Sequence, residues 1–102
     1  MRIEADVLQK LNTVFGRYPN IAKVKLYGSR AKGSFRNGSD IDLALIGSEV
    51  DHRQLVRISR ELDDLMLPYS FDITNYSTIS NVALKDHIDR MGKVLFINEA
   101  HK

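Results

Sequence analysis

Two aspartates, Asp40 and Asp42, stand two residues apart in a segment whose alternate positions are nonpolar. Alternation of this kind is typical of a β-strand with one buried face, so both carboxylates project from the same side. Their Cα atoms are then roughly 6.6 Å apart, which lets the two carboxylates reach toward one point. A divalent cation between them relieves their mutual repulsion, and Mg²⁺ prefers hard oxygen ligands of this kind. The pair therefore predicts a magnesium site.

The nonpolar positions of the same segment indicate on which side of the sheet the aspartates lie. Ile41, Leu43 and Leu45 alternate with the two aspartates. A shift of one residue in the register would bury both charges and expose three nonpolar side chains. We therefore expect both aspartates on the open face of the sheet.

A phosphate site is predicted upstream, where Gly28 and Ser29 stand between a strand-like segment and a short helix. Backbone N–H groups and the helix dipole at such a turn can point at an anion, and glycine lets a phosphate approach the backbone closely. Arg30 adds positive charge beside it, within a stretch that contains five basic residues and no acidic one: Lys23, Lys25, Arg30, Lys32 and Arg36. Ten residues separate Ser29 from Asp40, enough to bring the triphosphate and metal sites together.

The elements that must position these residues follow from the spacing of nonpolar side chains. Helical spacing predicts helices over 3–15, 51–66 and 82–91, and alternation predicts strands over 22–27, 39–46, 69–75 and 94–97. A further helical turn from Arg30 would end at the turn signal Asn37–Gly38. The order αβαβαβαβ indicates an α/β sandwich. In the third strand, Tyr69, Phe71 and Ile73 should face the core, and Ser70, Asp72 and Thr74 the opposite side.

Length and composition restrict the class of protein. The 102 residues suit a single domain over 1–102, and 43% hydrophobic with 27% charged residues is near the globular average. No nonpolar run approaches the roughly 20 residues that a membrane helix requires, and the N-terminal segment lacks the nonpolar core of a signal peptide. We expect a soluble, cytoplasmic protein without membrane contact. Cysteine is absent, so a bound metal would need oxygen or imidazole ligands.

The two motifs together resemble a known family. The segments from Gly28 to Gly33 and from Ser39 to Leu43 look like the signature of the minimal nucleotidyltransferases, which belong to the DNA polymerase β-like superfamily and are paired in prokaryotes with HEPN-domain proteins. Asp72 is similar to the third carboxylate that the superfamily often has on a later strand. The resemblance covers about residues 22–76. It implies an α/β nucleotidyltransferase fold of the polymerase β-like type, with a small mixed sheet flanked by helices.

The same resemblance implies a reaction and a role for each motif residue. Asp40 and Asp42 would ligate two Mg²⁺ ions, and Asp72 would ligate the catalytic ion and help activate an acceptor hydroxyl. Gly28 and Ser29 would bind the β- and γ-phosphates. Two ions would stabilise the entering and leaving oxygens while pyrophosphate departs from the α-phosphorus. ATP is the implied donor, and a HEPN-domain protein, as the toxin of a toxin–antitoxin pair, is the implied acceptor.

Other interpretations of the sequence differ in class. The chain could be a catalytically idle module that neutralises its partner by contact, or a small RNA- or DNA-binding domain, as a pI near 9.0 suggests. The second lacks a known recognition motif, so we do not expect a nucleic-acid partner; the oligomeric state stays open. Asp63 and Asp64 fall in a helix and are expected to be solvated. The histidines, His52, His87 and His101, show no metal-ligand spacing and are assigned no role.

Overall fold

The computed structural model describes residues 5–27, 40–67 and 69–98. All seven helices and strands expected from the hydrophobic spacing are present, with boundaries within two residues wherever they can be compared. The short helical turn expected from Arg30 lies outside the described residues. In chain order the elements are α1 (Ala5–Phe15), β1 (Ile21–Tyr27), β2 (Asp40–Gly47), α2 (His52–Asp64), β3 (Ser70–Asn75), a short 3-10 helix η2 (Tyr76–Thr78), α3 (Val82–Met91) and β4 (Lys93–Ile97).

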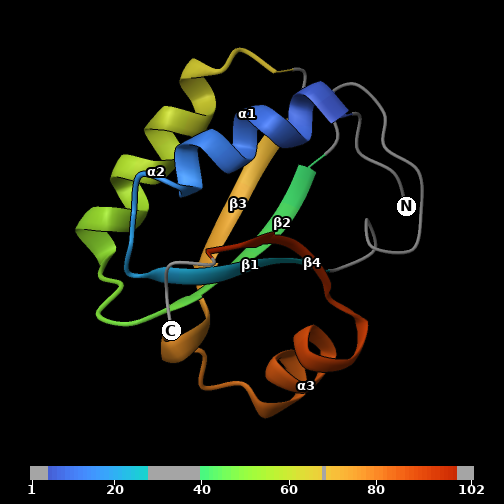
Figure 1. Ribbon diagram of the computed structural model, residues 1–102. Helices are drawn as coiled ribbons and strands as arrows, with labels where there is room; N and C mark the ends of the chain where they lie inside the picture. Colours follow the sequence, from blue (N-terminus) through green and yellow to red (C-terminus); the bar gives the residue numbers. More distant parts are fainter. Residues whose placement is uncertain (1–4, 28–39, 68, 99–102) are drawn as a thin grey trace.

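The four strands form one mixed sheet in the order β3-β2-β1-β4. Strand β1 is antiparallel to both β2 and β4, whereas β2 and β3 are parallel. Parallel neighbours need a crossover connection, which α2 supplies between β2 and β3. Figure 1 shows α1 and α2 together on one side of the sheet and α3 on the other.

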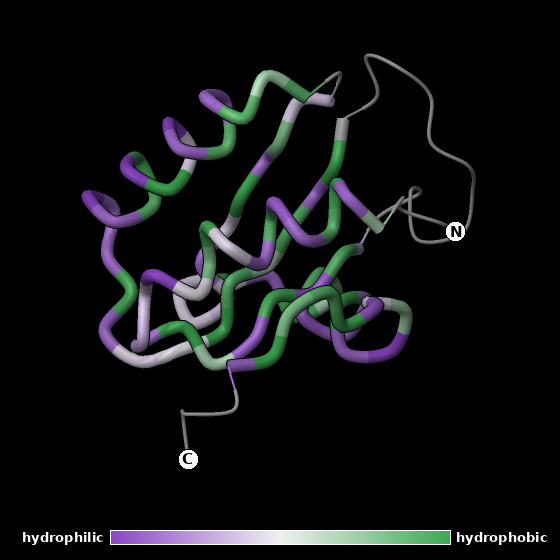
Figure 2. Tube along the Cα trace, turned by 45° about the horizontal axis from the view of Figure 1, so that its top comes forward, coloured by the Kyte–Doolittle hydropathy of each residue, from purple (hydrophilic) through white to green (hydrophobic). Residues whose placement is uncertain are grey.

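The main core lies between the sheet and the layer formed by α1 and α2. Ile41, Leu43 and Leu45 of β2 are at most 1% exposed, and they pack with nonpolar residues of both helices. Burial of these side chains is the main favourable term in folding, at roughly 1.5–3 kcal/mol for each large one. Helix α2 contributes Ile58 and Leu62 to the core, while its polar residues lie along its outer edge (Figure 2).

A second, smaller core lies on the other face of the sheet, where α3 packs. Its buried members are Tyr27 of β1, Ala44 of β2 and Ile88 of α3. This packing corrects the expectation that the aspartate-bearing face is open. Ala44 is fully buried, whereas Asp42 and Ile46 on the same face are half-buried, so the face is covered only in part.

Side-chain hydrogen bonds connect the helical layer to the neighbouring loops. Tyr18, in the loop after α1, donates to Glu61 of α2, and Arg17 forms an ion pair with the same carboxylate. At the start of α2, the side chain of Asp51 accepts from the backbone N–H of Gln54 at 2.8 Å and caps the helix. Among the described residues, no helix is both long and nonpolar enough to cross a membrane.

Candidate active site

Three side chains form a row across the sheet on the face that α3 partly covers. Tyr27 pairs with Asp42 in the antiparallel register of β1 and β2, and Asp42 pairs with Asp72 in the parallel register of β2 and β3. Directly paired residues on neighbouring strands share a face, and adjacent strands lie about 4.8 Å apart. The structure therefore brings Asp42 and Asp72 together from positions far apart in the sequence.

The other predicted site residues are placed only in part. Asp40 is the first residue of β2 and pairs with Ser70 of β3, which puts its backbone two residues before Asp42 in the same strand. The side chain of Asp40 lies outside the described part of the structure. Gly28, which directly follows β1, also lies outside the described residues, as do Ser29 and Arg30. Their roles remain predictions from the sequence.

The two described carboxylates differ in exposure. Asp72 is exposed, whereas Asp42 is half-buried because it lies next to the part of the face that α3 covers. Beside them in the row, Tyr27 is only 8% exposed, and its hydroxyl lies 3.3 Å from the Oγ1 atom of Thr74 in β3. The row is therefore buried at its β1 end and exposed at its β3 end.

Two carboxylates lie close enough to the phenol of Tyr27 to affect its pKa. Burial raises the pKa of Tyr27 above its usual value, the hydrogen bond with Thr74 opposes that rise, and the carboxylates of Asp42 and Asp72 add to it. Both carboxylates therefore act on the same phenol, and both belong to one local cluster. Such a cluster favours a cation, and its hard oxygen donors suit Mg²⁺.

The described residues do not by themselves form a metal site. Among them, no group of three His, Cys, Asp or Glu residues could hold a metal ion. Asp42 and Asp72 supply two carboxylates, and the third in the sequence motif is that of Asp40. The oxygen donors present fit Mg²⁺, which usually binds one or two protein carboxylates and completes its shell with water and phosphate oxygens.

The remaining acidic and imidazole residues lie elsewhere. Asp63 and Asp64 are exposed near the end of α2, on the opposite layer of the molecule, as expected for solvated residues. His52 is exposed at the start of α2, and His87 is half-buried in α3. His101 lies outside the described residues.

Sequence reasoning missed the structural role of Asn75. This residue is 4% exposed; its side-chain amide donates to the carbonyl oxygen of Val50 at 2.6 Å, and its side-chain oxygen accepts from both the backbone N–H and the hydroxyl of Ser77. It thereby fixes the end of β3 against the segment before α2. The available signal was an Asn two residues before a Ser, a pattern typical of local side-chain turns.

Sequence reasoning also missed the position of Tyr27. This residue packs in the smaller core, and its place in the row with Asp42 and Asp72 depends on strand register. A tyrosine directly before Gly28 at the end of a strand is the signal that could have indicated it.

This chain belongs to the polymerase β nucleotidyltransferase family, because the model of that family, described as "Polymerase beta, Nucleotidyltransferase", matches residues 9–101. No curated protein matches the sequence.

Solved structures with a similar fold come from toxin–antitoxin complexes. A chain of a toxin–antitoxin complex with AMP-PNP is 19% identical, with a TM-score of 0.74, over 91% of this chain and 75% of that one. A chain of the MntA–HepT complex is 16% identical, with a TM-score of 0.70 and coverage of 95% and 75%. A chain from the complex of tri-AMPylated Shewanella oneidensis HEPN toxin with MNT antitoxin is 16% identical, with a TM-score of 0.70 and coverage of 96% and 76%. These similarities show the nucleotidyltransferase fold.

Proposed function

We propose that this chain is a Mg²⁺-dependent nucleotidyltransferase that transfers an adenylyl group from ATP to a hydroxyl on a HEPN-domain partner protein. It would act in the cytoplasm, as a single domain over residues 1–102, and as the antitoxin of a toxin–antitoxin pair. The observation that carries the proposal is the direct pairing of Asp42 with Asp72 on a chain of the polymerase β nucleotidyltransferase family.

The carboxylates supply the ligands that the metal requires. Asp40, Asp42 and Asp72 would hold two Mg²⁺ ions, with all donors being hard oxygens. When bound, the ions supply charge neutralisation for the attacking and leaving oxygens of an in-line displacement.

The other motif residues orient the reactants. Gly28 and Ser29 would hold the β- and γ-phosphates through backbone N–H groups, and Arg30 would add positive charge beside them. Asp72 would accept the proton of the acceptor hydroxyl as the new bond from its oxygen to the α-phosphorus forms. The bond from the α-phosphorus to the bridging oxygen breaks, and pyrophosphate leaves with the electron pair.

The choice of donor and acceptor rests on similar proteins. One of the similar structures contains AMP-PNP, and another contains a tri-AMPylated HEPN toxin with an MNT antitoxin. Both observations favour ATP as donor and a HEPN-domain protein as acceptor.

The experiment mixes the protein with α-labelled ATP, Mg²⁺ and a HEPN-domain protein, and measures label on the protein acceptor. Asp40→Asn and Asp42→Asn should each lower transfer about 100-fold or more, the scale seen when one stabilising contact to the developing charge is lost. Asp63→Asn, which removes an exposed carboxylate on α2, is the matched control and should transfer normally.

The second candidate is an idle module that neutralises its partner by contact. Such a module would have the same nucleotidyltransferase fold and the same class of partner protein. It would not need to transfer a nucleotidyl group. If Asp42→Asn protects cells from the HEPN protein as well as the parent chain does, catalysis is not how this chain acts as an antitoxin.

A further inference from the structure

Three arginines form a continuous basic strip on the outer side of α2. Arg53, Arg57 and Arg60 follow helical spacing of four and three residues, and all three are exposed. At about 100° per residue they fall on one face, opposite Ile58 and Leu62, which are buried in the core. We call this strip the arginine face.

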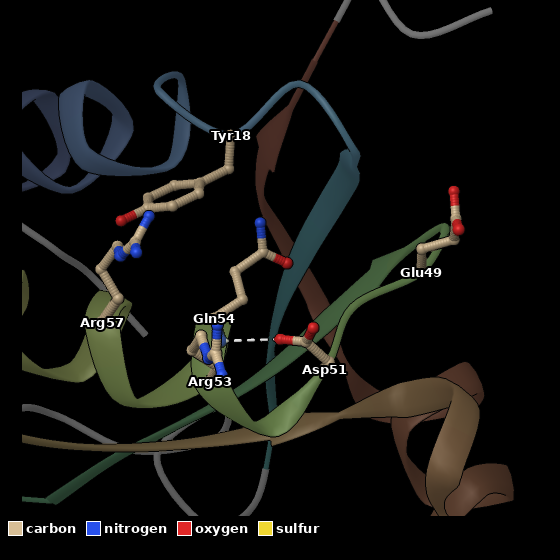
Figure 3. A pocket seen from close by; sticks show the side chains of 6 residues that line it. All are labelled: Tyr18, Glu49, Asp51, Arg53, Gln54 and Arg57. Atoms are coloured by element: carbon tan, nitrogen blue, oxygen red, sulfur yellow. Dashed lines mark hydrogen bonds between the residues drawn. The ribbon is translucent and has the colours of Figure 1, made fainter.

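The arginine face separates two surface hollows. One, of about 220 Å³, is lined by Tyr18, Glu49, Asp51, Arg53, Gln54 and Arg57. Figure 3 shows Tyr18 and Arg57 at one end of it and Glu49 at the other. The second hollow, of about 310 Å³, is lined by Arg53, Val56, Arg57, Arg60 and Glu61. Arg53 and Arg57 line both hollows, but the first also contains the carboxylates of Glu49 and Asp51, so the second is the more basic of the two.

Within the described part of the chain, no ion pair involves Arg53, Arg57 or Arg60. Glu61, the acid that lines the second hollow, already has partners of its own, because Tyr18 donates to it and Arg17 pairs with it. The hydrogen bond from Tyr18 is the main cause that lowers the pKa of Glu61, and the Arg17 and Arg57 charges add to the effect. Glu61 therefore stays ionised and fixed by its own partners.

A nonpolar side chain stands within the basic strip. Val56 is 40% exposed and lies on the same helical face, next to Arg53 and Arg57. Arginine stems can cover nonpolar surface while their guanidinium groups stay in water, and arginine is enriched in protein–protein interfaces. A phosphate backbone would use the charges but not Val56, whereas a protein segment with acidic and nonpolar side chains would use both.

We propose that the arginine face, together with the second hollow, binds an acidic segment of a partner protein, with carboxylates on Arg53 and Arg57 and a nonpolar side chain against Val56. Carboxylates match the planar guanidinium in bidentate pairs, so charge complementarity specifies the occupant. Helix α2 lies on the sheet face opposite Asp42 and Asp72, so a segment bound here leaves the candidate active site accessible. The inference concerns binding and stands whether or not the chain is an enzyme.

The test uses fluorescence anisotropy with three probes and the full chain. The first probe is a synthetic helical peptide with a stripe of glutamates beside a stripe of leucines. The second has serine in place of each leucine, and the third is a uridine oligonucleotide. Binding of the first peptide, weaker binding of the second and weakest binding of the oligonucleotide support the proposal. No binding of the first peptide overturns it, and tightest binding of the oligonucleotide assigns the face to nucleic acid instead.

Charge reversal locates the binding surface. Arg57→Glu should weaken binding of the first peptide about tenfold or more, since it replaces a favourable charge pair with a repulsive one. Lys93→Glu, at an exposed position in β4, changes the net charge equally and should have little effect. Equal losses in both variants would overturn the proposal, because they would show attraction to net charge alone. Far-UV circular dichroism verifies that both variants fold.

Chemical shifts of backbone amides give a second, independent readout. Addition of the first peptide to isotopically labelled protein should shift amides within α2, with little change at Asp42 or Asp72. Chemical-shift changes confined to strands β2 and β3 near Asp42 and Asp72 would overturn the assignment. Concentration-dependent dimerisation through α2 would instead identify a second copy of this chain as the occupant and would also overturn it.

Discussion

Asp42 of β2 and Asp72 of β3 lie directly opposite each other on neighbouring parallel strands. Like charges in such positions repel, and the pair contributes nothing to the hydrophobic core. Proteins retain an arrangement of this kind at a functional site even though it lowers stability. The pair is therefore the part of the fold where stability and the proposed chemistry are opposed.

Replacement of Asp72 by Asn should separate the effect of this carboxylate on stability from its effect on nucleotidyl transfer. The exposed amide keeps the shape of the side chain but removes the repulsion, so the free energy of unfolding should rise by a few tenths of a kcal/mol, up to about 1 kcal/mol. Adenylyl transfer should fall by about 10²-fold or more, because the proton acceptor is lost. Urea denaturation and the label-transfer assay measure the two quantities. A variant that is less stable and still active would contradict the assigned role; Asp64→Asn serves as the control.

Tyr27→Phe should lower the stability of the fold and leave the packing of the ring unchanged. The ring keeps its packing against Ala44 and Ile88, but the hydrogen bond with Thr74 is lost, at a cost of about 0.5–1.5 kcal/mol. Urea denaturation of Tyr27→Phe, Thr74→Val and the double variant forms a thermodynamic cycle. Strict additivity of the two single effects would show that the hydroxyl groups do not interact.

Tyr18 should make the fold sensitive to alkaline pH. Burial, followed by the hydrogen bond to Glu61 and the charge of that carboxylate, raises the pKa of Tyr18 from 10.0 to about 12. A group whose pKa is raised on folding stabilises the folded state fully below its unfolded pKa, so this contribution should be lost as pH rises from about 10 to about 12. The slope for one proton is at most about 1.4 kcal/mol per pH unit.

The measurement compares urea midpoints of the parent chain and Tyr18→Phe across this range. The variant lacks the titrating hydroxyl, so the difference between the two curves should shrink as pH rises. Lysine titration affects both proteins alike and cancels in the difference. A constant difference would show that the hydroxyl does not titrate in this window.

Gly47→Ala should destabilise the fold by about 1–3 kcal/mol, as overpacking commonly does. A Cβ atom at this position would lie 2.1 Å from the carbonyl oxygen of Asn20 and 2.9 Å from the Cα atom of Ile21, and both contacts are with backbone. Gly16→Ala is the matched control, because its nearest contact is 3.1 Å from the carbonyl oxygen of Asn12. Equal thermal midpoints for the two variants would contradict the close approach.

The sequence was sufficient for the order and type of the elements because each has clear periodicity. Alternation in β2 correctly assigned Ile41, Leu43 and Leu45 to the core, and the same pattern in β3 assigned Tyr69, Phe71 and Ile73. The α/β nucleotidyltransferase fold that the motif resemblance implied is confirmed by the family match and the similar structures.

The position of α3 could not be predicted in the same way. Its nonpolar residues show that it packs against something, but not which face of the sheet it covers, and Ala44 is too small to indicate burial by itself. For this reason the face expected to be open beside Asp42 is in fact partly covered. The direct pairing of Asp42 with Asp72 likewise depends on which strands are neighbours, and local sequence contains no such information. Asn75 depends on a contact with the distant Val50.

The parallel pairing of β2 and β3 has a consequence for how activity relates to folding. A hairpin of β1 and β2 could form early from local contacts, but it would carry Asp42 without Asp72. The second carboxylate arrives only after α2 has docked and the chain has closed a long loop, which is an entropically costly and slow kind of contact. Under the proposed function, a chain that has not yet formed the crossover holds only one of the two carboxylates and should therefore be inactive.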